Sequence, residues 1–138
     1  MISATTKLLK IGELSAQSGV SIQTIRYYEE LGLLHSSDRT EGNYRLFAPQ
    51  TVQRIAFIKR LQTLGLSLQA IKECLAIHDQ GDLPCATIQQ QLQERVREIE
   101  QKIHQLTALR NDLQSALDHW QEQPHKSNPD IICPNLEV

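Results

Sequence analysis

Residues 24–34 read TIRYYEELGLL, and residues 39–47 read RTEGNYRLF. The first stretch predicts a short helix, because Ser21 just before it is a good N-cap. Residues 11–18 predict another short helix, and Gly19 follows it as a C-terminal stop. Two short helices joined through a glycine-containing turn form a helix-turn-helix, whose second helix enters the major groove of DNA.

The second stretch predicts a β-wing, because its Gly42–Asn43 pair is a hairpin signal. The strands around this turn alternate only roughly, so we expect a short wing and not a proper sheet. Arginine forks match phosphate oxygens and guanine acceptors. One of the two adjacent tyrosines is expected in the core, because neighbours on a helix do not share a face. The candidate DNA-contacting residues of the helix and the wing are Thr24, Arg26, Tyr27, Tyr28, Arg39, Asn43, Tyr44 and Arg45.

The charge of the chain divides between its two halves. Residues 1–60 hold eight Lys and Arg against five Asp and Glu, a net charge of +3. Residues 61–138 hold six against eleven, a net charge of −5, and the two sum to the overall −2. The N-terminal half therefore has the sign needed to bind phosphates. A purely structural coiled-coil protein would leave these arginines unexplained.

Two further helices are expected before residue 80. Pro49 fits the first position, N1, of a helix that runs to about Gln62. Ser67 fits the N-cap of a helix over about 68–78. We therefore place a DNA-binding domain with two connecting helices at residues 1–80.

Residues 85–123 contain no Gly and no Pro. Apolar residues recur there every seven residues in two rows, which are Leu92, Ile99, Leu106, Leu113 and Trp120, and Val96, Ile103 and Leu117, with Arg110 interrupting the second row. This pattern predicts a long helix that pairs with a copy of itself, in an orientation that the pattern leaves open. The alternative is a helix that folds back on its own domain. We place a dimerisation helix at residues 81–120, and a homodimer suits a helix-turn-helix that reads two half-sites.

The chain has three cysteines, an odd number that does not suggest a secreted disulfide framework. It has no apolar run long enough to span a membrane and no basic-then-apolar leader, so we expect a cytoplasmic protein. Reduced thiols in such a protein serve as metal ligands or redox groups. An enzyme using Cys85 as a nucleophile would need a nearby histidine base, and no spacing supports one, so we expect no catalysis.

Several motifs together resemble the MerR family of transcription regulators, and more narrowly its short metal-sensing branch. They are residues 11–15 (IGELS), 24–29 (TIRYYE), 32–34 (GLL), 43–47 (NYRLF), 58–61 (IKRL) and 64–71 (LGLSLQAI), together with Arg39. The resemblance implies a mainly α-helical fold: a winged helix-turn-helix, a long helix forming an antiparallel coiled coil in a homodimer, and a short C-terminal metal-binding tail at residues 121–138. It also implies a repressor and activator that distorts promoter DNA for RNA polymerase when a ligand binds.

The resemblance places the sensor at the thiols. Divalent-metal sensors of this kind carry a cysteine at the position of Cys85, where copper(I) sensors usually have serine, and a second cysteine in the tail, as at Cys133. In those relatives the metal site is shared between subunits. They usually carry a third cysteine near the end of the long helix, where this chain reads Asp118-His119-Trp120-Gln121. The third ligand could be Cys74, His119 or His125, or could be absent. Cys74 could equally be a small buried hydrophobic residue.

The identity of the metal follows only partly from these ligands. Two thiols and few further ligands suit a soft ion, with Hg(II) favoured and Zn(II), Cd(II) and Pb(II) open. A thiol redox sensor of the same family would also use Cys85 and Cys133. We therefore expect a metal-responsive transcriptional regulator, with redox sensing as the alternative.

Overall fold

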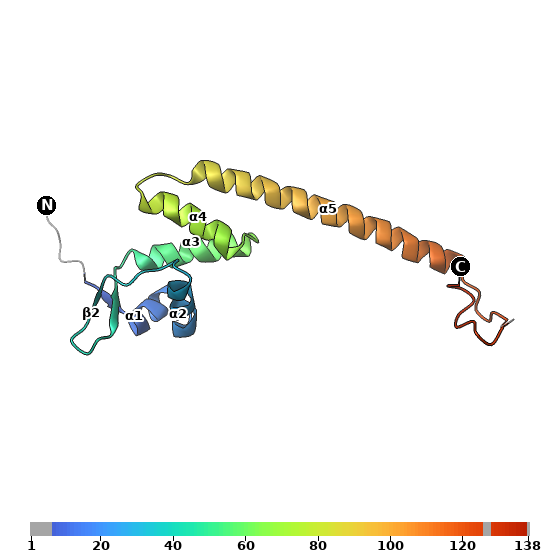
Figure 1. The fold of residues 1–138 in the computed structure, drawn as a ribbon, viewed down its shortest axis with the longest axis horizontal. Coiled ribbons are helices and arrows are strands. Elements are labelled where there is room, and N and C mark those ends of the chain that lie inside the picture. Colours follow the sequence, from blue (N-terminus) through green and yellow to red (C-terminus); the bar gives the residue numbers. More distant parts are fainter. Residues whose placement is uncertain (1–6, 126–127, 138) are drawn as a thin grey trace. The chain divides into compact units, whose positions relative to one another are not determined.

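The computed structural model describes residues 7–125 and 128–137 of the chain. The chain divides into two units, Met1–Arg95 and Val96–Val138. The elements in chain order are β1 (Leu9–Lys10), α1 (Ile11–Ser18), α2 (Ile22–Glu30), β2 (Asp38–Arg39), β3 (Arg45–Phe47), α3 (Thr51–Thr63), α4 (Leu68–Asp79) and α5 (Cys85–Asp118), as labelled in Figure 1. The fold is mainly helical, and the boundary between the two units falls within α5.

The helix-turn-helix at α1 and α2 forms where the sequence predicts it. Gly19 adopts a left-handed conformation with φ of 76°, and its N–H donates to the Ser15 carbonyl. The Ser15 hydroxyl also donates to the Val20 carbonyl at 2.6 Å, which braces the turn. Ser21 then caps α2, since its side chain accepts from the Thr24 N–H at 3.0 Å. These local bonds satisfy backbone groups that the helix ends leave unpaired.

The predicted wing is part of a three-stranded antiparallel sheet with strand order β1-β3-β2. The hairpin of β2 and β3 turns at Asn43, whose φ is 67°. The expectation of a wing without a proper sheet is wrong, because β1 adds a third strand in which Leu9 pairs with Phe47. Both side chains are buried, so the base of the wing is fixed to the core of the domain.

The core of the first unit draws on all four of its short helices and on the sheet. Its buried apolar residues are Leu9, Leu14, Ile25, Tyr28, Leu33, Leu34, Phe47, Ile55, Ile58, Leu61, Leu66, Ile71, Cys74 and Leu75. The first turns of α5 also belong to this unit, because Ile88 and Leu92 pack against this core. Leu92 is predicted above to lie in the dimer seam, but the structure places it against its own domain.

The start of α3 differs from the prediction. The helix begins at Thr51 with Gln50 as its N-cap, so Pro49 lies two residues before the helix and not at N1. The N–H of Thr51 donates to the Ala48 carbonyl, and that of Val52 donates to the Pro49 carbonyl. These are three-residue bonds of a tight turn, which leads the chain from β3 into the helix.

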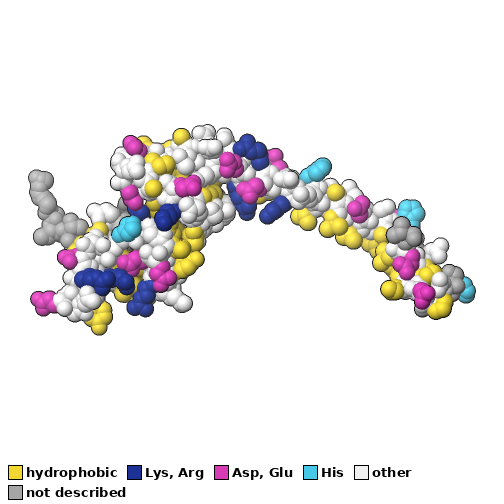
Figure 2. All heavy atoms as spheres, viewed as in Figure 1, with side chains coloured by type: hydrophobic (Ala, Val, Ile, Leu, Met, Phe, Trp, Pro, Cys, Tyr) yellow, Lys and Arg dark blue, Asp and Glu magenta, His cyan; other side chains and the backbone are white. Residues whose placement is uncertain are grey.

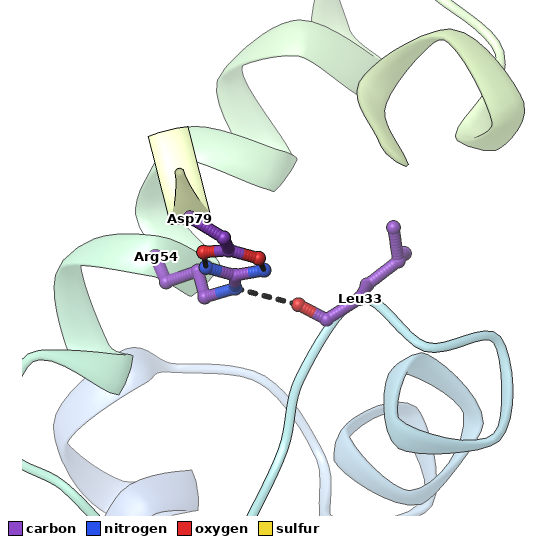
Figure 3. A network of polar contacts seen from close by, with 3 residues as sticks. All are labelled: Leu33, Arg54 and Asp79. Atoms are coloured by element: carbon purple, nitrogen blue, oxygen red, sulfur yellow. Dashed lines mark hydrogen bonds and ion pairs between the residues drawn. The ribbon is translucent and has the colours of Figure 1, made fainter. Parts of the chain in front are cut away.

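Arg54 joins three segments of the first unit, as Figure 3 shows. Its Nε donates to the Leu33 carbonyl, in the segment after α2, at 2.6 Å. Its two terminal nitrogens donate to the carboxylate of Asp79, the last residue of α4, at 2.6 and 3.0 Å. The hydrogen bonds from Arg54 hold the pKa of Asp79 below its ordinary value. The side chain of Arg54 is 17% exposed. This mostly buried side chain therefore connects α3 to α4 and to the segment that follows α2.

The part of α5 in the second unit carries a row of exposed apolar side chains, visible in yellow in Figure 2. They are between 42% and 64% exposed and comprise Val96, Ile99, Ile103, Leu106, Leu109, Leu113 and Leu117. The helix ends at Asp118, so Trp120, predicted in the same row, lies beyond it. Among the described helices, none is long and apolar enough to cross a membrane.

Candidate DNA-binding surface and metal-binding thiols

The two adjacent tyrosines of α2 have opposite environments. Tyr27 is 50% exposed, whereas Tyr28 is 4% exposed and its hydroxyl donates to Gln62 Oε1 at 2.7 Å. Burial raises the pKa of Tyr28. The prediction that one of them lies in the core is confirmed, and Tyr28 is the buried one. Its contact with DNA stays a prediction. Arg26 is exposed, and Thr24 is partly covered beside the cap at Ser21.

The predicted wing residues divide into those that build the turn and those that face outward. The Arg39 guanidinium donates to the backbone carbonyl and the side-chain oxygen of Asn43, at 3.1 and 3.3 Å. Tyr44 is 73% exposed. Arg45 lies 3.1 Å from Glu29 of α2 in an ion pair between Nε and Oε1. Arg39 and Asn43 therefore shape the loop, while Tyr44 and Arg45 are available at its surface.

Basic side chains gather in the first unit around α2 and the wing, in dark blue in Figure 2. Arg26 and Arg45 line one open cleft of about 200 Å³ together with Glu29 and Glu30. The sequence did not point to Glu29, because its partner Arg45 lies sixteen residues further along the chain. An exposed helix, an exposed wing and two arginines converging on one cleft form a surface suited to DNA phosphates.

The three thiols lie in different environments. Cys85 is exposed at the first residue of α5, and Cys133 is partly buried in the C-terminal segment. Cys74 is fully buried in the core, and its thiol donates to Gln91 Oε1 at 3.3 Å. Burial and the neighbouring charge of Glu73 raise the pKa of Cys74, which favours the thiol over the thiolate that a metal needs. The surroundings of Cys74 are those of a core residue.

The candidate histidines are not gathered with other ligands. His119 places Nδ1 3.0 Å from the Ser115 carbonyl, and His125 is exposed. Within residues 7–125 and 128–137, no three His, Cys, Asp or Glu side chains come together as a metal-binding group. The identity of a third ligand beside Cys85 and Cys133 stays a prediction.

The winged helix-turn-helix and its basic surface define a DNA-binding protein. Residues 9–76 match the MerR HTH family regulatory proteins, and residues 52–116 match the family described as MerR, DNA binding. A mercuric resistance operon regulatory protein from Bacillus cereus is 37% identical over 130 residues, which are 94% of this chain and 95% of that protein. The chain belongs to the MerR family of transcriptional regulators.

Two solved structures of regulators are similar to this chain in fold. The transcription regulator PbrR691 from Ralstonia metallidurans CH34, crystallised with lead(II), gives a TM-score of 0.72 at 28% identity, covering 86% of this chain and 93% of that chain. A dual-function regulator MerR from Bacillus megaterium MB1, crystallised with mercury(II), gives a TM-score of 0.61 at 32% identity, with coverages of 87% and 93%. The fold of this chain is therefore that of the MerR regulators.

Proposed function

We propose that this protein is a homodimeric, metal-responsive regulator that binds promoter DNA and changes its shape when Cys85 and Cys133 bind a soft divalent ion. The observation that carries the proposal is the exposed thiol of Cys85 at the start of α5, the helix whose exposed apolar row begins at Val96. A ligand held at this residue acts on the first turn of the dimerisation helix. RNA polymerase on the same promoter is the proposed reader of the change.

The dimer is supported by the apolar row of α5. Seven large apolar side chains, 42–64% exposed, follow one another at intervals of three or four residues along this helix. A monomer rarely leaves a contiguous apolar surface of this kind in water. A second copy of α5 would cover this row, and we propose the antiparallel arrangement implied by the family resemblance.

The thiols fit a soft metal better than a hard one. Thiolate ligands select soft ions such as Hg(II), whereas Mg²⁺ and Ca²⁺ prefer oxygen. Cys74 is buried in the core, so Cys85 and Cys133 are the two accessible thiols of the chain. A two-thiol donor set suits Hg(II), which accepts few ligands, and we propose it ahead of Zn(II), Cd(II) and Pb(II). Relatives whose names or crystals contain mercury or lead support the class of ion.

The test is an anaerobic titration of the reduced protein with Hg(II), Cd(II), Pb(II) and Zn(II), following thiolate-to-metal absorption. Cys85→Ser and Cys133→Ser are each expected to abolish tight binding. Cys74→Ser is the matched control, since it removes a thiol that is buried, and it should bind like the wild type. Affinity should rise with pH, because binding displaces the thiol protons.

Two outcomes would redirect the proposal. Loss of binding in Cys74→Ser would make the site a three-thiol site and would require the core around Cys74 to open. Failure of every metal to bind tightly would refute metal sensing. In that case, reversible oxidation of Cys85 and Cys133 would be measured next, because the redox alternative uses the same two thiols.

A further inference from the structure

The ion pair between Glu29 and Arg45 crosses from the DNA-reading helix to the wing. Glu29 lies on α2, and Arg45 is the first residue of β3. Arg45 Nε lies 3.1 Å from Glu29 Oε1, and the side chains are 42% and 17% exposed, respectively. The acid is therefore the more buried partner, and the arginine the more exposed one.

A carboxylate at this place is unfavourable for DNA binding taken by itself. Glu29 faces the same open cleft as Arg26 and Arg45, and a negative charge there repels phosphates. An ion pair on the surface also contributes little to folding, about 0–1 kcal/mol. Neither its electrostatic effect on DNA nor its effect on stability explains why an acid occupies this position.

The geometry gives Glu29 a different role. An arginine has five N–H donors in a planar fork, and only its Nε is needed to reach one carboxylate oxygen. The ion pair with Glu29 uses Nε of Arg45. No hydrogen bond or ion pair among the described residues occupies its two terminal nitrogens, and Arg45 lines the same cleft as Arg26. A fixed arginine loses less conformational entropy when it binds a phosphate.

We propose that Glu29 is a positioning residue that fixes the Arg45 fork so that Arg45 and Arg26 hold one backbone phosphate of DNA between the reading helix and the wing. The cleft of about 200 Å³ has the room for a phosphate oxygen pair and a few waters, since a water in the liquid takes about 30 Å³. This inference deepens the DNA-binding part of the proposed function and does not depend on metal sensing.

The test compares Glu29→Gln with Glu30→Gln in metal-free, reduced protein. The probe is a duplex selected from a random-sequence pool by the wild-type protein, and the readout is the dissociation constant. Both variants lose one negative charge beside the same cleft, but only Glu29 is paired with Arg45. Glu30→Gln should bind DNA more tightly, whereas Glu29→Gln should bind about three- to tenfold more weakly, the cost of ordering a free arginine.

A second comparison separates positioning from a general effect on the fold. In an Arg45→Ala background, Glu29→Gln should no longer weaken binding and should tighten it slightly, because only the repulsion remains. Weakening of the same size in both backgrounds would show a structural role and overturn the proposal. Tighter binding by Glu29→Gln in the wild-type background would show that the acid only repels DNA, and would overturn it as well.

Arg45→Lys keeps the charge and leaves Glu29 unchanged, so it tests the proposal even if Glu29→Gln folds poorly. A lysine ammonium cannot pair with Glu29 through one nitrogen and present a fork to a phosphate. Binding should fall in both Arg45→Lys and Arg45→Ala. The slope of log K against log salt concentration should drop by about 0.9 only in Arg45→Ala, because the lysine keeps the positive charge. Wild-type affinity in Arg45→Lys would overturn the proposal. Loss of metal response with unchanged DNA binding would affect the proposed function and leave this inference intact.

Discussion

Replacing Arg54 with methionine tests how the first unit is held together. The change keeps most of the apolar stem and removes all the donors of the guanidinium. One of them bonds the Leu33 carbonyl at 2.6 Å, and two others bond Asp79 at 2.6 and 3.0 Å. The residue Leu33 is 1% exposed, so water has little access to replace the lost donor.

The expected cost can be divided between these two partners. A hydrogen bond to a charged group contributes about 1.5–3 kcal/mol, and this applies to the Leu33 carbonyl. The Asp79 side chain is 44% exposed, so solvent screening limits the pair with Arg54 to about 0.5–1 kcal/mol. Arg54→Met should therefore lower the free energy of unfolding by about 2–4 kcal/mol. Asp79→Asn should lower it by no more than about 1 kcal/mol.

The assay is equilibrium urea unfolding of the wild type, Arg54→Met and Asp79→Asn at one protein concentration, since the stability of the proposed dimer depends on concentration. Equal losses in the two variants would refute the division, because they would show that the bond to the Leu33 carbonyl contributes nothing.

The pH dependence of the Asp79 variant gives a second check. The folded-state pKa of Asp79 is lowered, first by the hydrogen bonds from Arg54, so its contribution is present above the unfolded value of about 4. The contribution is lost as the pH falls through the lowered folded value. The difference between wild type and Asp79→Asn should thus disappear in acid. A difference that grows in acid would contradict the assigned direction.

Three further changes test other parts of the structure. Gly65→Ala should lower the free energy of unfolding by at least about 1–2 kcal/mol, because Gly65 has φ of 87° and a Cβ there would lie 2.5 Å from an arginine of α5. Gly81→Ala is the control: Gly81 has φ of 90° with open space around it, so only the backbone strain should destabilise this variant. Leu106→Glu should dissociate the dimer in sedimentation, because it puts a charge into the exposed apolar row of α5; an unchanged dimer would place the interface elsewhere. A heterodimer of Cys85→Ser and Cys133→Ser protomers should bind one metal ion per dimer in the titration if the ligands are shared between subunits, whereas a site within one chain predicts none.

Short-range signals were enough to predict the helix-turn-helix, the wing turn and the long helix. The Ser21 cap, the Gly19 stop and the Ser67 cap act within four residues along the chain, and the structure has all three. The seven-residue row of α5 is likewise a property of one helix. The start of α3 was predicted wrongly because the short-range signal is ambiguous there. A proline at N1 and a proline in the preceding turn look alike in sequence.

Contacts between distant residues decided the rest. Tyr28 meets Gln62 across 34 residues, Arg54 meets Asp79 across 25, and Cys74 meets Gln91 across 17. Periodicity cannot state which of two adjacent tyrosines lies inside, which cysteine is buried, or which acid faces Arg45. These choices depend on the packing of α2 against α3 and β3 and of α4 against α5, because burial and pairing are set by the neighbours that the fold brings together.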